Sequence, residues 1–390
     1  MPHRPAERLH TVRLDLNRSA GPGAPIRANL SVAERVGRTL FVASDEGASI
    51  ERLVCRDDGS YGEHRSFRLA DLFDLPAGAE GEVDIEGLSA DDGWLWVTGS
   101  HSLARRKPKP DQHDADACLK RLTEVRRDPN RYLLGRIPLV AAGKDGVYDL
   151  GAADGARSAA CLKMGAKRNV LAKRLRRDEH IGRFIEVPAK ENGFDIEGVA
   201  ARGQRVFLGL RGPVLRGWAC ILELKVRERK PGRLRLDGFG KDGCQYVKHF
   251  VDLDGLGIRE LTFDADGSLL ILAGPTMDLD GPVVLWRWDG ALKSDRPTLV
   301  PRSRLTRVLD VPYGTGFDHA EGICCFEAED GGPRLLVVYD NPGDDRLQSD
   351  GAGVEADVFA LPTASTGVVG QIGQIAKTVV TPVLRGDKAG

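Results

Sequence analysis

The most informative residues of this chain are four glutamates that recur at the same point of similar segments. Each lies just before a short apolar run, a polar turn and a second apolar run, and three of them are followed directly by glycine. Side chains at equivalent points of a repeated β unit converge, and converging carboxylates repel one another unless a cation or protons neutralise them. Carboxylate oxygens are the ligands that Ca²⁺ and Mg²⁺ take. The pattern therefore predicts a divalent-cation site formed by Glu86, Glu197, Glu260 and Glu321.

Two aspartates extend this predicted site. Asp84 and Asp195 precede their glutamates by two residues, and residues i and i+2 lie on the same face of a strand. We therefore expect both to be metal ligands, and His319 takes the same place before Glu321. A structural interpretation explains the repetition as well, because each glutamate can accept hydrogen bonds from backbone N–H groups of an adjacent unit and so join the units together.

Further polar residues stand where the second apolar run of each unit ends, and we expect them on the same side as the glutamates. His101 and His319 are candidate general bases because imidazole titrates near neutral pH, although a surface-loop histidine is the simpler interpretation of His101. Arg211 is a candidate for stabilising an oxyanion or, alternatively, an ion-pair partner of a ring carboxylate. The residues predicted to bind an anionic substrate are Arg211, Arg216, Arg105, Asp340 and Asn341.

The segments that position these residues are predicted to be β-strands arranged in repeats. The four glutamates are 111, 63 and 61 residues apart, and polar turns such as DADG separate the apolar runs. A fifth segment, which starts at Asn29, has the same rhythm without the Glu-Gly pair. Each unit continues with two more candidate strands. Four strands about every 60 residues are typical of the blades of a β-propeller, an all-β fold.

The strand count predicts five blades, with six as the alternative because the spacing of 111 residues has room for another blade. The last unit has a third strand, VEADVFAL from Val354, but no clear fourth. An unassigned strand, HTVRLDLN, starts at His10. Pairing these two strands would close the ring and leave no open sheet edge. We therefore predict that the N-terminal strand completes the last blade.

The long spacing is explained by a helical insertion in blade two. The third and fourth strands of this blade are predicted at YLLGRIPLV from Tyr132 and at VYDLG from Val147, and helices are predicted from Ala115 to Arg127 and over roughly 157–177. Residues 1–362 are thus predicted to form one propeller domain with insertions at about 104–130 and 155–180. We expect residues 363–390 to form a C-terminal tail that is disordered in part.

Composition narrows the classes of function. The chain carries 56 Lys and Arg against 57 Asp and Glu, which argues against a general surface for nucleic acid or anionic membranes. The seven cysteines have no CxxC spacing, and neither a signal-peptide core nor an apolar run of 18 residues is present, so we expect a cytoplasmic protein. Walker, Rossmann, HExxH and GxSxG motifs are missing, which leaves nucleotide-dependent and classical serine-hydrolase chemistry unsupported.

One segment carries a resemblance to a known family. KENGFDIEGVAARGQRVFLGLRGPVLRGWACILEL, from Lys190, resembles the hallmark of an uncharacterised bacterial family of the domain-of-unknown-function type, and FDHAEGI and VVYDNP fit the same pattern. This resemblance implies no activity. The Glu-Gly phrase is also similar to that of gluconolactonase-type and esterase-like phytase propellers. In the lactonase type the glutamate lies at the mouth of the central channel and binds a divalent cation, although the Asn and Asp ligands of those families have no identified counterparts here.

Two functions follow as expectations. The first is a metal-dependent hydrolase that acts on a small phosphoester, ester or lactone at the channel mouth, with Ca²⁺ or Mg²⁺ as the cofactor and a small anionic molecule as the ligand. The basic run RRKPK from Arg105 would attract such a substrate, or is simply a solvated face. The second is a non-catalytic propeller that binds a ligand or a protein, with a structural glutamate ring.

Overall fold

The computed structural model describes residues 4–17, 26–143, 145–240, 243–277, 279–328 and 330–363. The tail predicted from residue 363 lies outside these residues, apart from its first position. The described part is all-β in character, and its two α-helices are α1 (Ala115–Thr123) and α2 (Val170–Leu175). None of the helices in these ranges has the length and apolar character needed to cross a membrane.

Most strands belong to antiparallel units of about four. The first unit consists of β2 (Leu30–Val36), β3 (Thr39–Ser44), β4 (Ser49–Cys55) and β5 (Tyr61–Arg68). The third consists of β15 (Asp195–Arg202), β16 (Arg205–Gly212) and β17 (Trp218–Lys230), with β18 (Arg233–Asp237) and β19 (Val247–Asp252) both paired to β17. The fourth consists of β20 (Gly257–Phe263), β21 (Leu269–Gly274), β22 (Val283–Trp288) and β24 (Thr306–Val311). The short β23 (Thr298–Val300) pairs with β19.

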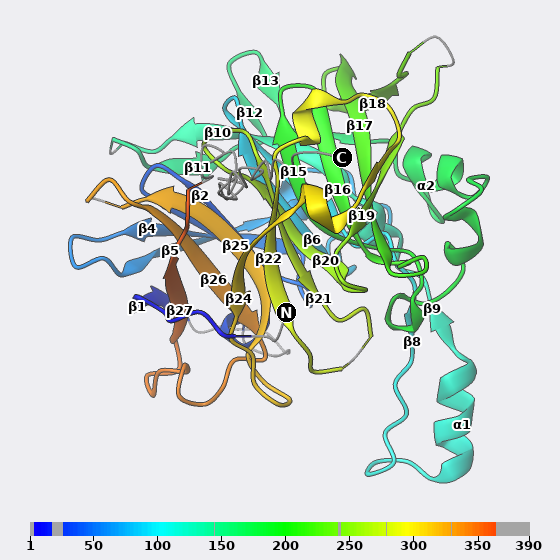
Figure 1. Cartoon of the computed structure of the whole chain (residues 1–390), viewed down its shortest axis with the longest axis horizontal. Coiled ribbons are helices and arrows are strands. Elements are labelled where there is room, and N and C mark those ends of the chain that lie inside the picture. Colours follow the sequence, from blue (N-terminus) through cyan, green and yellow to red (C-terminus); the bar gives the residue numbers. More distant parts are fainter. Residues whose placement is uncertain are drawn as a thin grey trace, which may run out of the picture.

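The second unit is the least regular. It consists of β6 (Ile85–Asp91), β7 (Trp94–Gly99) and β10 (Leu134–Ala141), and both β11 (Tyr148–Leu150) and β14 (Ala160–Leu162) pair with β10. Two small hairpins belong to the same region, β8 (Ala104–Arg105) with β9 (Val125–Arg126) and β12 (Ala153–Asp154) with β13 (Arg157–Ser158). Helix α1 lies between β8 and β9 and projects from the sheets (Figure 1).

The helix predicted over roughly 157–177 is wrong for most of its length. Residues Ala160–Leu162 form β14, which is buried between β10 and β18. The apolar residues of β14 therefore pack within a sheet and not on the face of a helix. Helix α2 begins only at Val170, where the side chain of Asn169 accepts a hydrogen bond from the Ala172 N–H (2.9 Å). An asparagine in this position is a typical helix N-cap.

The last unit is completed from the other end of the chain. It consists of β25 (His319–Glu327), β26 (Pro333–Asp340), β27 (Gly353–Ala360) and β1 (His10–Asp15). Strand β1 runs antiparallel to β27, from the His10–Val358 pair to the Asp15–Gly353 pair, and the two lie side by side in Figure 1. The predicted pairing of the N-terminal strand with the last unit is therefore confirmed.

The first strands of the five units contact one another in cyclic order: β2, β6, β15, β20, β25 and β2 again. The glycines that follow the glutamates explain how closely they pack. A Cβ atom at Gly87 would lie 2.7 Å from the backbone nitrogen of Val199, and one at Gly198 would lie 2.6 Å from that of Leu261. Only glycine lets neighbouring backbones approach this closely. The Glu-Gly pair thus has a packing function that is separate from the chemistry of the carboxylate.

Candidate functional site

Each first strand carries a β-bulge near its start. The position of this bulge identifies equivalent residues in the five units more reliably than the Glu-Gly pair does. The register shifts fall between Leu30 and Val32 in β2 and between Ile85 and Gly87 in β6, with equivalent shifts in the other three strands. A bulge leaves one residue unpaired and re-aims its side chain. The residues at this position are Ser31, Glu86, Glu197, Arg259 and Glu321. We call the side of the ring where these strands begin the mouth.

This alignment corrects the prediction for Glu260. The bulge of β20 falls at Arg259, and Glu260 pairs with Leu272, so Glu260 takes the place that glycine has in three other units. Its side chain is buried, and its Oε1 accepts a hydrogen bond from the Leu261 N–H (2.8 Å). Burial raises the pKa of Glu260 well above its usual value. The fourth ring position therefore carries a guanidinium group and not the predicted carboxylate.

The ends of the second strands form an equivalent set. These residues are Asp45, Ser100, Arg211, Gly274 and Asp340. Asp45 is a candidate ligand that the sequence analysis missed, because the first unit lacks the Glu-Gly phrase. In an alignment of the segment from Asn29 with the other units, Asp45 takes the position that Arg211 and Asp340 hold in theirs.

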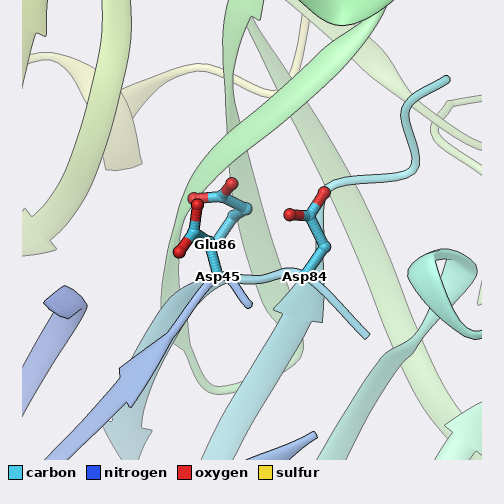
Figure 2. A group of neighbouring side chains, drawn as sticks. All are labelled: Asp45, Asp84 and Glu86. Atoms are coloured by element: carbon cyan, nitrogen blue, oxygen red, sulfur yellow. The ribbon is translucent and has the colours of Figure 1, made fainter. Parts of the chain in front are cut away.

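Three carboxylates meet at one point of the mouth. The side chains of Asp45, Asp84 and Glu86 each offer an oxygen within 4.8 Å of the others. Figure 2 shows them gathered where β3 ends and β6 begins. Asp84 has a φ of 57°, in the left-handed region that aspartate tolerates. The Oδ1 atom of Asp45 is buried and has no hydrogen-bond donor among the described residues. This group, which we call the acidic triad, offers only oxygen ligands.

The protonation of these carboxyls is strongly perturbed. Burial, with nearby Glu321 and Asp340, raises the pKa of Asp45 to about 8. Burial, together with Glu197 and Asp84, raises the pKa of Glu86 well above its usual range. Loss of hydration also raises the pKa of Asp84, although the Arg131 charge opposes this effect. The mouth therefore favours protons or a cation on its carboxylates.

Arg131, Arg211 and Arg259 neutralise part of this negative charge. Arg131 Nη1 lies 2.9 Å from Asp84 Oδ2. Arg211 Nη1 donates to Glu197 Oε1 (2.8 Å) and lies 4.0 Å from Asp195 Oδ2. The carboxylates of the mouth outnumber these arginines and are Asp45, Asp84, Glu86, Asp195, Glu197, Glu321 and Asp340.

Arg259 ties two ring glutamates together. Its Nη1 lies 3.2 Å from Glu197 Oε2, and its Nη2 pairs with Glu321. Burial raises the pKa of Glu321 to about 7, against the opposing charge of Arg259. Glu197 and Glu321 are thus occupied by arginines, whereas Glu86 has no hydrogen bond or ion pair to any described residue. The ring therefore divides into an arginine-bound half and the acidic triad.

A pocket of about 320 Å³ opens beside the arginine-bound half. Arg211, Arg259, His319, Glu321 and Asp340 all line it, together with Lys190 and the apolar side chains of Met277 and Leu279. The structure thus brings together four predicted site residues, Arg211, His319, Glu321 and Asp340. The His319 Nε2 atom lies 3.2 Å from Asp280 Oδ1. A histidine held by a carboxylate in this way can act as a general base.

His101 is separated from this chemistry. Its Nδ1 lies 2.8 Å from the Gly99 carbonyl oxygen, and its Nε2 lies 2.7 Å from the Asn169 side-chain amide. The Asn169 amide also donates to the Tyr132 carbonyl (2.8 Å). Burial lowers the pKa of His101 to about 4, so the ring is neutral at pH 7. Both ring nitrogens are occupied, and His101 anchors the start of α2 to the second unit.

Three further predicted residues lie elsewhere. Arg105 is bound by Glu191 (Nη2–Oε2 3.0 Å) and by the Leu122 carbonyl (2.6 Å), outside the mouth pocket. Arg216 is exposed and is not among the residues that line this pocket. The Asn341 amide donates to the Gly316 carbonyl (2.6 Å) and so stabilises a loop. Substrate contacts at these positions are not supported by the geometry, because Arg105 and Asn341 serve local contacts and Arg216 does not line the pocket.

The fold and the mouth define a strand-repeat protein with an acidic and arginine-rich site at one end of a ring. The chain matches, over residues 29–357, the family described as "Protein of unknown function (DUF3616)". It therefore belongs to that family, and the predicted membership of a family of the domain-of-unknown-function type is confirmed. No curated protein matches the sequence.

Several solved structures are similar at low identity. Glutaminyl cyclase from Myxococcus xanthus is 10% identical with a TM-score of 0.40, over 92% of this chain and 100% of that one. The calcium-binding protein regucalcin from Agrobacterium tumefaciens is 11% identical with a TM-score of 0.35, over 90% and 96%. The PQQ-bound aldose sugar dehydrogenase of Streptomyces coelicolor is 16% identical with a TM-score of 0.34, over 91% and 99%. Likeness at this level carries no information on activity.

Proposed function

We propose that this protein is a five-bladed β-propeller that hydrolyses a small anionic phosphoester, ester or lactone at its mouth, with a bound divalent cation, Ca²⁺ or Mg²⁺. The cyclic contacts of five first strands support the blade count. The acidic triad is the observation that carries the functional proposal. Its oxygen-only ligand set is that of a hard divalent cation, and the Asp45 Oδ1 atom has no donor among the described residues.

In this proposal Asp45, Asp84 and Glu86 hold the cation. Such an ion, when bound, polarises a substrate oxygen and lowers the pKa of a bound water. The three ligands come from two units, because Asp45 follows β3 whereas Asp84 and Glu86 stand at the start of β6. A cation would therefore also join the first and second units. It would offset the burial and the neighbouring negative charges that raise the pKa values of Asp45 and Glu86.

The neighbouring pocket supplies the remaining functions. Arg211 binds the anionic group of the substrate and stabilises charge that develops on an oxygen. His319, held by Asp280, accepts the proton of the attacking water. Met277 and Leu279, which are 46% and 63% exposed, offer an apolar contact for the rest of the substrate. A pocket of about 320 Å³ restricts the substrate to small molecules.

The first experiment measures Ca²⁺ and Mg²⁺ binding to EDTA-treated protein by calorimetry. We expect Glu86→Gln to lower the cation affinity at least about tenfold, because it removes one ligand charge with little change of shape. The metal-free variant should be as stable as the wild type or more so, since repulsion is relieved. Asp57→Asn is the matched control, because Asp57 is fully exposed in the β4–β5 turn. A wild-type protein that binds neither cation and has the same melting temperature in EDTA would rule out the metal site.

A second candidate is a non-catalytic binding module. The arginine-bound half of the ring favours it, because Arg211 and Arg259 satisfy Glu197 and Glu321 without any ligand. An assay of p-nitrophenyl esters, p-nitrophenyl phosphate and simple lactones, with saturating Ca²⁺ or Mg²⁺, separates the two functions. Turnover that is lost in both Glu86→Gln and His319→Gln supports the hydrolase. Cation binding without turnover of any of these substrates supports the binding module.

A further inference from the structure

A second pocket, of about 680 Å³, lies where the first strands end, at the side of the ring opposite the mouth. Residues near the ends of β2, β15, β20 and β25 line it, including Arg35, Arg202, Phe263 and Phe326. The mouth is formed by the starts of the same strands. The two pockets share none of their lining residues. The proposed hydrolytic site therefore makes no use of this second pocket, which we call the far pocket.

Two arginines of the far pocket have no anionic partner in the described part of the chain. The Arg35 guanidinium lies 4.6 Å from the centre of the Phe326 ring, and that of Arg202 lies 5.1 Å from the centre of the Phe263 ring. Neither has a carboxylate or a hydrogen-bond acceptor among the described residues, and the Nε atom of Arg35 is buried. A buried guanidinium donor without an acceptor is costly. This differs from Arg211 and Arg259 at the mouth, which are held by carboxylates.

Four acidic residues, Glu34, Asp264, Asp266 and Glu327, also line the far pocket, and within the described part of the chain none of them forms an ion pair with Arg35 or Arg202. Asp266 accepts the Ser268 N–H (2.8 Å), and Glu327 is exposed. Asp264 is bound to Arg287 (Oδ2–Nη2 2.6 Å) and accepts the Ala265 N–H (2.7 Å). Glu34 accepts the Ala90 N–H (2.8 Å), and burial raises the pKa of its carboxyl to about 8. At neutral pH this carboxyl is largely protonated, so it neither neutralises an arginine nor strongly repels an incoming anion. The two guanidinium groups are therefore available to a ligand.

The other walls define the rest of such a ligand. Phe263, Phe326, Pro333 and Leu361 give the pocket an apolar lining, and Thr262 adds a hydroxyl group. Small-molecule sites combine apolar walls with a few polar groups that fix orientation. Guanidinium groups bind carboxylate and phosphate in a two-pronged geometry. An arginine stacked on an aromatic ring is also held in place before the ligand arrives, which lowers the entropic cost of binding.

We propose that the far pocket binds a small organic anion, a carboxylate or phosphate group on an apolar body, with Arg35 and Arg202 on the anionic group. Phe263 and Phe326 lie against the apolar body. The site is separate from the mouth, and it does not depend on a bound cation or on hydrolysis. The ligand class follows from two guanidinium groups without an anionic partner among the described residues and from the apolar side chains beside them.

The test is calorimetric titration of the full chain with benzoate and with phenyl phosphate. We expect wild-type protein to bind at least one of them, with Arg35→Gln and Arg202→Gln each weakening the affinity about tenfold or more. Lys190→Gln, at the mouth, and Arg229→Gln, on the exposed end of β17, are charge-matched controls and should leave the affinity unchanged. Arg35→Lys keeps the charge but loses the two-pronged geometry, and it should also bind more weakly.

Each result of the titration either supports the proposal or overturns it. Failure of the wild type to bind either probe at about 10 mM would overturn the proposal, because such an affinity is weaker than about 3 kcal/mol. Binding that Lys190→Gln weakens as much as Arg35→Gln does would place the probe at the mouth, and binding that Arg229→Gln weakens as much would show an effect of overall charge; either result would overturn the proposal. If Arg35→Gln fails to fold, Arg35→Lys and Arg202→Gln decide the matter. Which probe binds more tightly distinguishes a carboxylate ligand from a phosphate ligand.

Discussion

Arg211 is the residue whose role the structure defines most sharply. Its side chain is 7% exposed, and it neutralises Glu197 directly and Asp195 at longer range. We predict that Arg211→Met destabilises the protein by roughly 3–5 kcal/mol, because Glu197 loses one of its two arginines and Asp195 loses the guanidinium 4.0 Å away. Glu197→Gln in the same chain should recover part of this loss. A urea-unfolding double-mutant cycle measures the coupling, and strictly additive effects would contradict the ion-pair role.

The raised pKa values of the mouth predict a pH dependence of stability. Asp45 and Glu321 have pKa values of about 8 and about 7 in the folded protein, whereas an unfolded chain has carboxyl values near 4. Between these folded and unfolded pKa values, the folded state therefore binds more protons than the unfolded state. The free energy of unfolding falls as the pH rises through this range. His101 acts in the opposite sense, since its pKa is lowered to about 4, but its contribution is complete above about pH 6.5.

The measurement is accordingly the melting temperature from pH 6.5 to 8.5 in EDTA. We expect it to decrease with pH, and to decrease less in the presence of Ca²⁺, because the cation replaces the protons. Asp45→Asn should flatten the slope in EDTA. A melting temperature that does not fall across this range would show that the mouth carboxyls are already ionised in the folded protein at neutral pH.

The site was only partly predictable from sequence. Glu86, Glu197 and Glu321 were identified correctly as ring positions because the Glu-Gly pair marks the bulge. Arg259 was not identified, because Glu260 and Leu261 resemble a Glu-Gly pair but stand one residue after the bulge. A shift of one residue changes the face of the strand on which a side chain lies. Asp45 belongs to the unit without the Glu-Gly pair, so only an alignment of that unit with the others would have identified it. It reaches the triad only because β3 returns to the mouth.

At the scale of elements, strands were more predictable than helices. Apolar runs correctly predicted β1, β10 and β27, because strands buried in a sheet carry this pattern in their own sequence. The helix expected over roughly 157–177 failed because basic residues between apolar ones imitate an amphipathic helix. The contacts of β14 with β10 and β18 decide that segment. Such tertiary pairings leave no local signal in the sequence.

The element with the clearest structural role is β1. Deleting residues 1–17 should expose the edge of β27 together with the side chains that Val12 and Leu14 cover in the core. We predict that this protein aggregates or melts at a much lower temperature, since an open edge templates further strand pairing. A deletion of residues 1–9 keeps β1 and is the control. Equal melting temperatures and solubility for the two deletions would contradict the closing role of β1.

At the scale of the whole molecule, the triad should couple cation binding to global stability. The cation would bridge the first and second units, so it binds only the folded ring. Ca²⁺ at about a hundredfold excess over its Kd should then add about 2.7 kcal/mol to the free energy of unfolding. Chemical denaturation with and without Ca²⁺ measures this gain. It should be largely absent in Asp45→Asn, and an equal gain in that variant would place the cation elsewhere.

The pairing of β1 with β27 also has a consequence for biosynthesis. Strand β1 is made before every other described strand, yet its partner, Gly353–Ala360, is the last of them to be made. The ring can therefore close only after β27 has been made, and contacts this distant in sequence form slowly. Until then, β1 and the early units present unpaired edges to the cell. We expect refolding followed by Trp fluorescence to show an early phase, from the units themselves, and a later phase that the deletion of residues 1–17 removes.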